Sequence, residues 1–237
     1  MSTMKPLPKM DVICLTGGKC GSTTLRTTFI QNGYKCIKAH DKACFKRQFK
    51  YDGLLDLIKR SSANKELFII DSYRTPIERK ISSFFENIHI HVPNYKNKSI
   101  QELIDIFNTE HLNVIEEYHS IDPIMEECGV ELFDTFDFER KYVIKKKGNL
   151  IFIKLLYSNM NNWGENLSEI FNKEITMYSG NKSENKEYYS IYNKFKQMYR
   201  TKKSYIDNIL KNDQQFRIFN TPEQQDIYIN KHLETAF

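Results

Sequence analysis

The feature that most constrains the fold is an apolar run that leads through a glycine-rich turn into a stretch with helical periodicity. The run covers residues 11–16, and the periodic stretch ends near Ile30. This order predicts a buried strand, a tight turn and a helix N-terminus, where backbone N–H groups and the positive end of the helix dipole attract an anion. The turn and the start of the helix contain Gly17, Gly18, Lys19, Cys20, Gly21, Ser22, Thr23 and Thr24.

These residue types predict a loop that holds a phosphate or a sulfate ester. Glycines let the backbone approach the anion closely, the lysine adds a positive charge, and the hydroxyls donate hydrogen bonds. The loop is not a Walker A motif, in which a glycine, a lysine and a serine or threonine follow one another. Here Lys19 precedes Gly21 by two positions. We therefore expect a phosphate site that differs from the usual ATP cradle.

A second segment has the same organisation. Residues 67–70 form a continuous apolar run, which is typical of a strand buried on both faces, and residues 75–78 (Thr-Pro-Ile-Glu) predict a helix start with a capping box. Arg74 then lies at the carboxyl end of a strand, and Ser82 lies about two turns into the helix. Ligands of parallel sheets bind at the carboxyl ends of the strands, so we expect Arg74 and the glycine-rich loop to share one rim.

Apolar runs, capping residues and turn residues predict the other elements. Further strands are expected at residues 34–39, 67–71 and 174–178, with a β-hairpin formed by 141–144 and 150–155. Helices are expected at 22–31, 54–59 and 76–89, from 99 onward, at 162–172, at 183–212 (one long helix or a broken pair) and from 221 to 233. Strands that alternate with helices predict an α/β fold with a mainly parallel sheet and helices on both faces.

The two motifs together resemble those of sulfotransferases that use 3′-phosphoadenosine 5′-phosphosulfate (PAPS). In that family a Lys-x-Gly-Ser/Thr-Thr loop binds the 5′-phosphosulfate, and an Arg-x-Pro-x-x-Arg-x-x-Ser element binds the 3′-phosphate. Residues 19–24 match the first motif and residues 74–82 match the second without a gap. The resemblance is close through about residue 90, faint beyond it, and closer to the carbohydrate branch than to the small-phenol branch.

This resemblance implies a P-loop NTPase-like sulfotransferase fold and an enzyme that moves the sulfuryl group of PAPS to a hydroxyl or amine. PAPS is the expected donor, 3′,5′-ADP the product, and no metal is expected. The acceptor is unidentified, with a saccharide as a candidate. Lys19 is expected to act on the bridging oxygen, residues 21–24 on the 5′-phosphate, and Arg74 and Ser82 on the 3′-phosphate.

Two further assignments depend on the resemblance. Similar enzymes close a basic loop over the cofactor, which makes Lys182 and Lys186 candidates, although the usual Lys-Gly-Arg signature is absent and a solvated loop is an equal alternative. A hydroxyl acceptor also needs a general base. His40 is favoured because it directly follows the second strand. The other candidates for this base are Glu86, His89, His91, Glu116 and Glu117.

Two other functions stay open at this point. A divergent P-loop kinase or nucleotide hydrolase needs an acidic magnesium ligand at a strand end, and Asp71 is available. A nucleotide-binding protein without turnover would keep the cofactor loop but transfer no sulfate.

Composition limits the remaining classes. The length of 237 residues suits one domain over residues 1–237, with a flexible stretch at 1–10. The net charge of +5 suits a polyanionic small-molecule cofactor. The sequence has no arginine-rich block of the kind that predicts nucleic-acid binding. It also has no apolar stretch as long as the roughly 20 residues of a membrane span. The five cysteines have no CxxC spacing, so reduced thiols and a cytoplasmic location are expected.

Overall fold

The computed structural model describes residues 7–50, 53–112, 121–180 and 186–233. Its internal contacts divide the chain into two compact units. The sheet unit comprises residues 1–73 and 119–181, and the helical unit comprises residues 74–118 and 182–237. The single domain expected over residues 1–237 stays a prediction.

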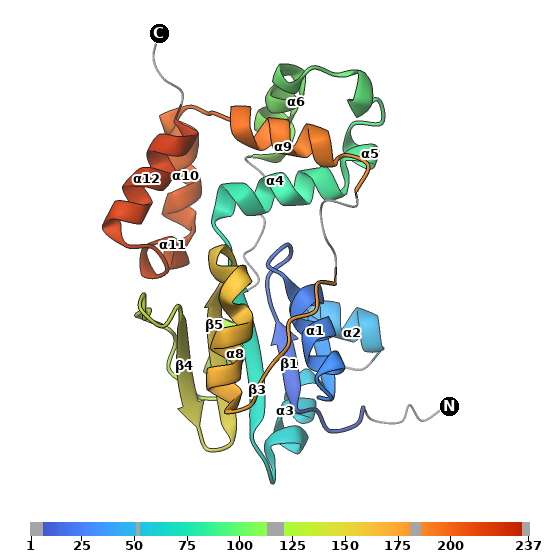
Figure 1. The fold of residues 1–237 in the computed structure, drawn as a ribbon, viewed down its shortest axis with the longest axis vertical. Helices are drawn as coiled ribbons and strands as arrows, with labels where there is room; N and C mark the ends of the chain where they lie inside the picture. The colour runs from blue at the N-terminus through green and yellow to red at the C-terminus, as the bar shows by residue number, and fades with distance from the viewer. Residues whose placement is uncertain (1–6, 51–52, 113–120, 181–185, 234–237) are drawn as a thin grey trace. The chain divides into compact units, whose positions relative to one another are not determined.

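A five-stranded sheet forms the centre of the sheet unit (Figure 1). Its strand order is β2-β1-β3-β5-β4, and all neighbours are parallel except β4 and β5, which form an antiparallel hairpin. This arrangement confirms the predicted α/β fold with a mainly parallel sheet. The strands are β1 (Val12–Leu15), β2 (Cys36–Ala39), β3 (Leu67–Tyr73), β4 (Tyr142–Lys147) and β5 (Leu150–Leu156).

Helices cover the sheet, which explains its continuous apolar strands. α1 (Ser22–Gln31) and α8 (Trp163–Phe171) lie on the viewer's side of the sheet in Figure 1. They pack on side chains that alternate along the strands, namely Val12, Cys14, Ile70, Ile151, Ile153 and Leu155. The intervening side chains, which include Ile13, Ile69 and Phe152, point to the opposite face and are also fully buried.

The order of the strands determines where a ligand is expected. β1 pairs with β2 on one side and with β3 on the other. The connections therefore diverge at the carboxyl end of β1, which is the topological switch point where open parallel sheets bind ligands. The glycine-rich loop leaves β1 at this point.

The remaining elements of the sheet unit connect and flank the strands. They are α2 (Lys42–Phe49), α3 (Leu54–Ser62), α7 (Asp122–Glu127) and the 3₁₀ segment η3 (Tyr157–Asn162). In the predicted flexible stretch 1–10, the described part is anchored: Arg60 donates to the carbonyl of Leu7, and the N–H of Met10 donates to Ser61.

The strand predicted at residues 174–178 is wrong, because this segment has no regular secondary structure and pairs with none of the described strands. Its backbone bonds go to side chains of α1, of its C-cap Asn32 and of α8 instead. Thr176 exchanges hydrogen bonds with the amide of Asn32, and the N–H of Tyr178 donates to the hydroxyl of Thr28. The apolar Ile175 and Met177 thus pack into the core beside α1 and α8 without joining the sheet.

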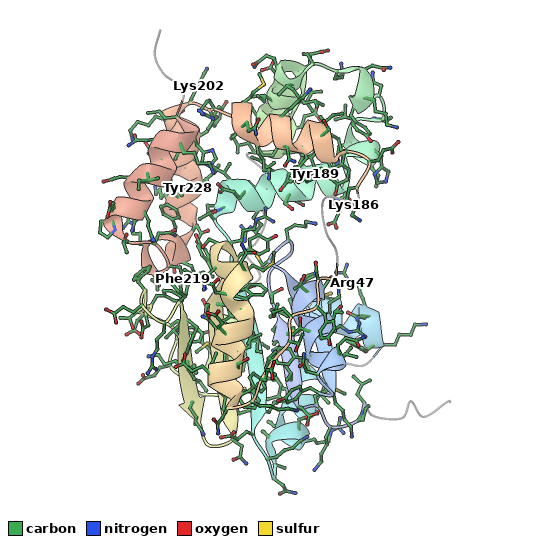
Figure 2. All side chains as sticks on the ribbon, in the orientation of Figure 1. Arg47, Lys186, Tyr189, Lys202, Phe219 and Tyr228 are labelled. Carbon is green, nitrogen blue, oxygen red and sulfur yellow. The ribbon has the colours of Figure 1, made fainter. Side chains whose placement is uncertain are left out.

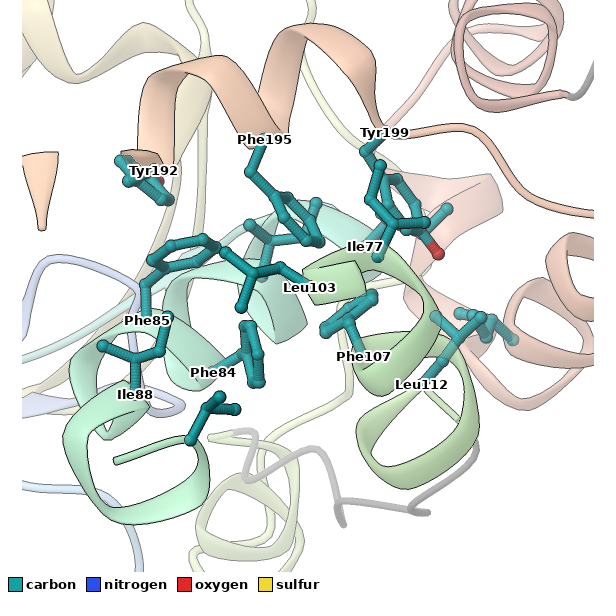
Figure 3. Packing of buried hydrophobic residues seen from close by; sticks show 14 of the residues in the cluster. Ile77, Phe84, Phe85, Ile88, Leu103, Phe107, Leu112, Tyr192, Phe195 and Tyr199 are labelled. Carbon is teal, nitrogen blue, oxygen red and sulfur yellow. The ribbon is translucent and has the colours of Figure 1, made fainter. Parts of the chain in front are cut away.

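The helical unit is built around an aromatic core. Figure 3 shows Phe84 and Phe85 packed with Phe107, Phe195 and Tyr199. The chain supplies this core from α4 (Pro76–Glu86), α5 (Ile88–His91), η1 (Tyr95–Asn97), α6 (Ile100–Ile106), η2 (Phe107–His111), α9 (Tyr189–Met198), α10 (Lys203–Asn212), α11 (Gln214–Ile218) and α12 (Pro222–His232). Of the two forms predicted for residues 183–212, the broken pair is confirmed.

The sequence predicts capping residues at the start of three of these helices, α4, α6 and α12. Two of the three cap their helix as expected. Ser99 and Thr221 form complete capping boxes at α6 and α12. Thr75 precedes α4 without accepting a backbone N–H, and its hydroxyl donates to the carboxylate of Glu78 at 2.7 Å instead. The helix start is confirmed there, and the capping box is wrong.

Glu78 and its neighbour attach the start of α4 to the C-terminal helix. The backbone N–H of Ile77 donates to the hydroxyl of Tyr228, which is labelled in Figure 2, at 2.9 Å. Glu78 accepts from Lys231 at 2.7 Å and from the ring of His232 at 3.1 Å. Burial of Glu78 opposes ionisation, but the hydrogen bond from His232 and the attraction of His232 and Lys231 hold its pKa well below the ordinary 4.5.

The lowered pKa of Glu78 makes a prediction about acid stability. Ionised Glu78 stabilises the fold above pH 4.5, and this contribution is lost as the pH falls below that value. Glu78→Gln should lower the free energy of unfolding by about 1–3 kcal/mol at pH 7, and the difference from wild type should shrink at pH 3. Urea unfolding, followed by circular dichroism, measures the free energy of unfolding of each protein at pH 7 and at pH 3. The exposed Glu223→Gln is the control, and an equal loss in both variants contradicts the assignment.

Candidate functional site

The loop between β1 and α1 turns sharply at two residues with left-handed backbone conformations. Gly21 has a φ of 86° and is the N-cap of α1, and Lys19 has a φ of 66°. A non-glycine residue in this region costs roughly 1–2 kcal/mol. Among the described residues, the other non-glycine residues with positive φ are Lys50, Lys141 and Asn172, of which the first and last end helices. Lys19 alone among these four lies between a strand and a helix N-terminus.

Gly21 cannot be replaced without moving its surroundings. A Cβ atom at this position would lie 2.7 Å from Cη2 of Trp163 and 3.5 Å from Cε2 of Tyr157. Trp163 is fully buried and its indole N–H donates to the carbonyl of Leu156 at 2.9 Å, so the ring has little freedom to retreat. Close contact with α8 therefore requires glycine at the N-cap of α1.

Side chains from neighbouring strands hold the loop. The hydroxyl of Ser72, on β3, donates to the backbone carbonyl of Cys20. Cys20 is fully buried, so its thiol does not face solvent. Neither Ser72 nor Trp163 was among the site residues predicted from sequence, because their roles depend on strand pairing and helix packing across long separations.

The N-terminus of α1 presents unpaired donors. The first intrahelical bond joins the N–H of Leu25 to the carbonyl of Gly21, at 3.0 Å, so the amides of residues 22–24 have no intrahelical acceptor. Gly21 offers no capping side chain, and the first turn contains no acidic residue. The positive end of this helix is thus not neutralised within its own first turn, which favours a bound anion.

Lys38 adds a positive charge beside this helix end. Its ammonium group donates to the hydroxyl of Thr23 at 2.8 Å. Lys38 lies on β2 two residues after Cys36, so both side chains point to the face that α1 covers. Sequence reasoning missed Lys38, although this alternation is a signal that could have found it.

His40 directly follows β2 and is half-buried. Its Nδ1 lies 2.7 Å from the backbone carbonyl of Thr16, at the end of β1. A carbonyl only accepts hydrogen bonds, so Nδ1 carries the hydrogen and Nε2 of the neutral ring keeps its lone pair. This contact orients the imidazole and also leaves a nitrogen that can accept a proton.

Asp71 is fully buried inside the sheet. Its carboxylate accepts from Lys154 at 2.5 Å, from the N–H of Ser72 at 2.7 Å and from the N–H of Ile121 at 3.3 Å. Burial raises the pKa of Asp71, and the attraction of Lys154 opposes this rise. Both carboxylate oxygens are thus engaged in structural contacts away from solvent.

The predicted 3′-phosphate residues belong to the helical unit. Arg74 is 9% exposed, and its Nη2 donates to the hydroxyl of Tyr192 at 3.4 Å. Ser82 is half-buried on α4, about two turns beyond Arg74. The guanidinium is thus held at the start of α4 by a residue of α9 that sequence reasoning did not identify.

The loop expected to close over the cofactor is described only in part. Lys186 is half-buried just before α9 (Figure 2), and Lys182 lies outside the described residues. Gly180, the last described residue before Lys182, packs against Thr23 of α1.

The alternative bases that the structure describes belong to the helical unit. Glu86 is exposed on α4, and His89 and His91 are exposed on α5, all in the helical unit. Glu116 and Glu117 lie outside the described residues.

Three further features bear on other kinds of site. Among the described residues, no group of three or more histidine, cysteine, aspartate or glutamate residues could hold a metal. All five cysteines are free thiols. No helix in the described ranges is long and apolar enough to cross a membrane.

Comparison of the chain with protein-family models, with curated proteins and with solved structures found no match.

The packing of Gly21 makes a prediction with an internal control. Gly21→Ala forces a side chain into both a left-handed conformation and the ring of Trp163, and should lower the free energy of unfolding by about 2–4 kcal/mol. A Cβ at Gly18 would have no neighbouring atom within 4 Å, so Gly18→Ala should change the free energy of unfolding by less than about 0.5 kcal/mol. Trp163 is the single tryptophan, so its fluorescence reports the unfolding. Equal stability of the two variants would show that Gly21 is replaceable.

Proposed function

We propose that this protein is a PAPS-dependent sulfotransferase. The observation that carries the proposal is Lys19, held with a φ of 66° in a glycine turn between β1 and the uncapped N-terminus of α1. A strained backbone conformation is retained where the surroundings enforce it, and it often marks a functional side chain. Here the strain is at the one charged residue of an anion-binding loop that departs from the Walker A spacing.

The residues present suit a nucleotide with two phosphate groups. The amides and hydroxyls of residues 22–24 would hold the 5′-phosphate, and Lys19 would lie near the oxygen that links phosphate to sulfate. In the helical unit, Arg74 and Ser82 would hold the 3′-phosphate, because a guanidinium fork and a hydroxyl both donate to phosphate oxygens. The donor would supply an activated sulfuryl group.

The chain's own residues would then act mainly by positioning and charge. Lys19 would neutralise the negative charge that develops on the linking oxygen, which is the kind of electrostatic contact that stabilises a transition state most. His40 would take the proton of the acceptor hydroxyl or amine at Nε2, because Nδ1 is bonded to Thr16. The acceptor class is open, with a saccharide as the first candidate.

The kinase or hydrolase alternative has less support. It relies on Asp71 as the magnesium ligand, and both oxygens of Asp71 bond to Lys154 and to backbone amides in a fully buried position. A cytoplasmic location is proposed with the sulfotransferase function, since free thiols are typical of a reducing compartment.

Nucleotide selectivity tests the proposal. The protein should bind 3′,5′-ADP about 10–150-fold more tightly than 5′-AMP, because one charge-assisted hydrogen bond contributes about 1.5–3 kcal/mol. Calorimetry without and with magnesium should give the same affinity. Arg74→Gln should remove most of the preference, and Arg47→Gln, a change of an exposed arginine on α2 (Figure 2), should keep it.

Two results of this calorimetry oppose the proposal. Equal affinity for both nucleotides would leave Arg74 without a role in binding. A magnesium-dependent preference for ATP would instead favour the kinase. Tight binding of 3′,5′-ADP without sulfate transfer to any acceptor would indicate the nucleotide-binding protein without turnover.

Replacement of His40 separates its two possible roles. In His40→Asn the amide can still donate to the Thr16 carbonyl but cannot act as a base, so turnover should fall by about 10²–10⁴ while melting temperature and 3′,5′-ADP affinity stay near wild type. His40→Ala should lose stability as well. Turnover is measured as transfer of labelled sulfate to an acceptor found by screening saccharides, phenols and amines. Normal turnover of His40→Asn would make His40 purely structural.

A further inference from the structure

Lys38 and Thr23 form a contact that the proposed mechanism does not use. Lys38 lies on β2, and Thr23 is the second residue of α1. The ammonium nitrogen of Lys38 is 2.8 Å from the hydroxyl oxygen of Thr23. The contact therefore joins the second strand to the helix end that the proposal assigns to the 5′-phosphate.

Gly180 fixes the other side of the same threonine. A Cβ on Gly180 would lie 2.9 Å from the Cγ2 methyl of Thr23 and 3.0 Å from its carbonyl oxygen. Glycine is thus required for the segment that follows α8 to approach α1 this closely. The methyl of Thr23 packs against Gly180 and its hydroxyl faces Lys38, so the side chain is held from both sides.

The chemistry of the two groups determines which way the hydroxyl hydrogen points. A hydroxyl has one hydrogen and two lone pairs, whereas an ammonium group only donates. The oxygen of Thr23 must therefore accept from Lys38, and its hydrogen is directed elsewhere. Within the described ranges Lys38 is the one hydrogen-bond partner of this hydroxyl. A hydroxyl that accepts from a cation is polarised into a better donor, which suits an anion at the start of α1.

We propose that Lys38 is a positioning residue that acts through Thr23: it holds the Thr23 hydroxyl as a donor toward the 5′-phosphate of the bound nucleotide. The inference rests on the proposed function. It predicts that Lys38 contributes to binding through the hydroxyl and not through direct contact of its charge with the ligand.

A double-mutant cycle tests this coupling by calorimetry with 3′,5′-ADP. Thr23→Val should weaken binding about 10-fold, and Lys38→Met about 3–10-fold, as expected for one lost hydrogen bond and its partner. The double variant should bind no more weakly than Thr23→Val alone. Lys38→Arg, which can still donate, should restore affinity to within about threefold of wild type.

Controls separate this role from a structural one. Thr23→Ser keeps the hydroxyl but loses the methyl that packs on Gly180, so it should bind more tightly than Thr23→Val. Lys35→Met removes an exposed lysine at the opposite end of β2 and should bind like wild type. Melting temperatures without ligand show whether any variant unfolds. A purely structural Lys38 would lower the melting temperature in Lys38→Met, and the affinity loss would persist in the Thr23→Val background.

The outcomes distinguish the inference from the proposed function. If wild type binds 3′,5′-ADP and the two changes are additive, Lys38 acts independently of Thr23 and the inference is overturned, while the proposed function stands. If wild type binds inorganic pyrophosphate but not 3′,5′-ADP, the proposed function fails, and the same cycle run with pyrophosphate decides the role of Lys38. Binding of neither probe overturns both.

Discussion

The candidate site depends on one constraint, which is the absence of a side chain at Gly21. The chain must leave a fully buried strand and begin a helix within a few residues while α8 packs directly against the turn. A Cβ at Gly21 would lie 2.7 Å from the ring of Trp163, and the φ of 86° would strain any other residue. The same turn brings the amides of residues 22–24 to the switch point of the sheet, so packing and the proposed anion binding would require the same glycine.

Contacts from the two strands beside β1 then hold the loop in place. Ser72 on β3 binds the carbonyl of Cys20, His40 after β2 binds the carbonyl of Thr16 at the end of β1, and Lys38 on β2 binds the hydroxyl of Thr23. The loop is thus preorganised by the sheet, which lowers the entropy that a ligand must overcome on binding. Preorganised donors are also what electrostatic stabilisation of a transition state requires.

The sequence predicted the parts of the site that local signals encode. The apolar run, the glycines and the capping residues gave β1, α1 and the start of α4 close to their observed bounds, because these signals act within a few residues. The contacts of Ser72, Lys38 and Trp163 were missed, since they depend on strand register and on packing between distant segments. For Lys38, the alternation along β2 gave only the face on which its side chain lies. The Nδ1 bond of His40 likewise needs β1 and β2 to be paired.

The errors have the same origin. Residues 174–178 have strand-like alternation, but their backbone groups pair with the side chains of Asn32 and Thr28 instead of a strand. Thr75 has a capping sequence, but its hydroxyl donates to Glu78, which also binds Lys231. In both cases a tertiary partner competed with the local pattern.

The central claim is that the loop at Gly21 holds the 5′-phosphate of a sulfonucleotide. A crystal structure of the protein with 3′,5′-ADP tests it most directly. The account predicts the 5′-phosphate on the amides of residues 22–24 with Lys19 beside it, and the 3′-phosphate on Arg74 and Ser82. Nucleotide bound elsewhere, with the N-terminus of α1 occupied by solvent alone, would contradict the account.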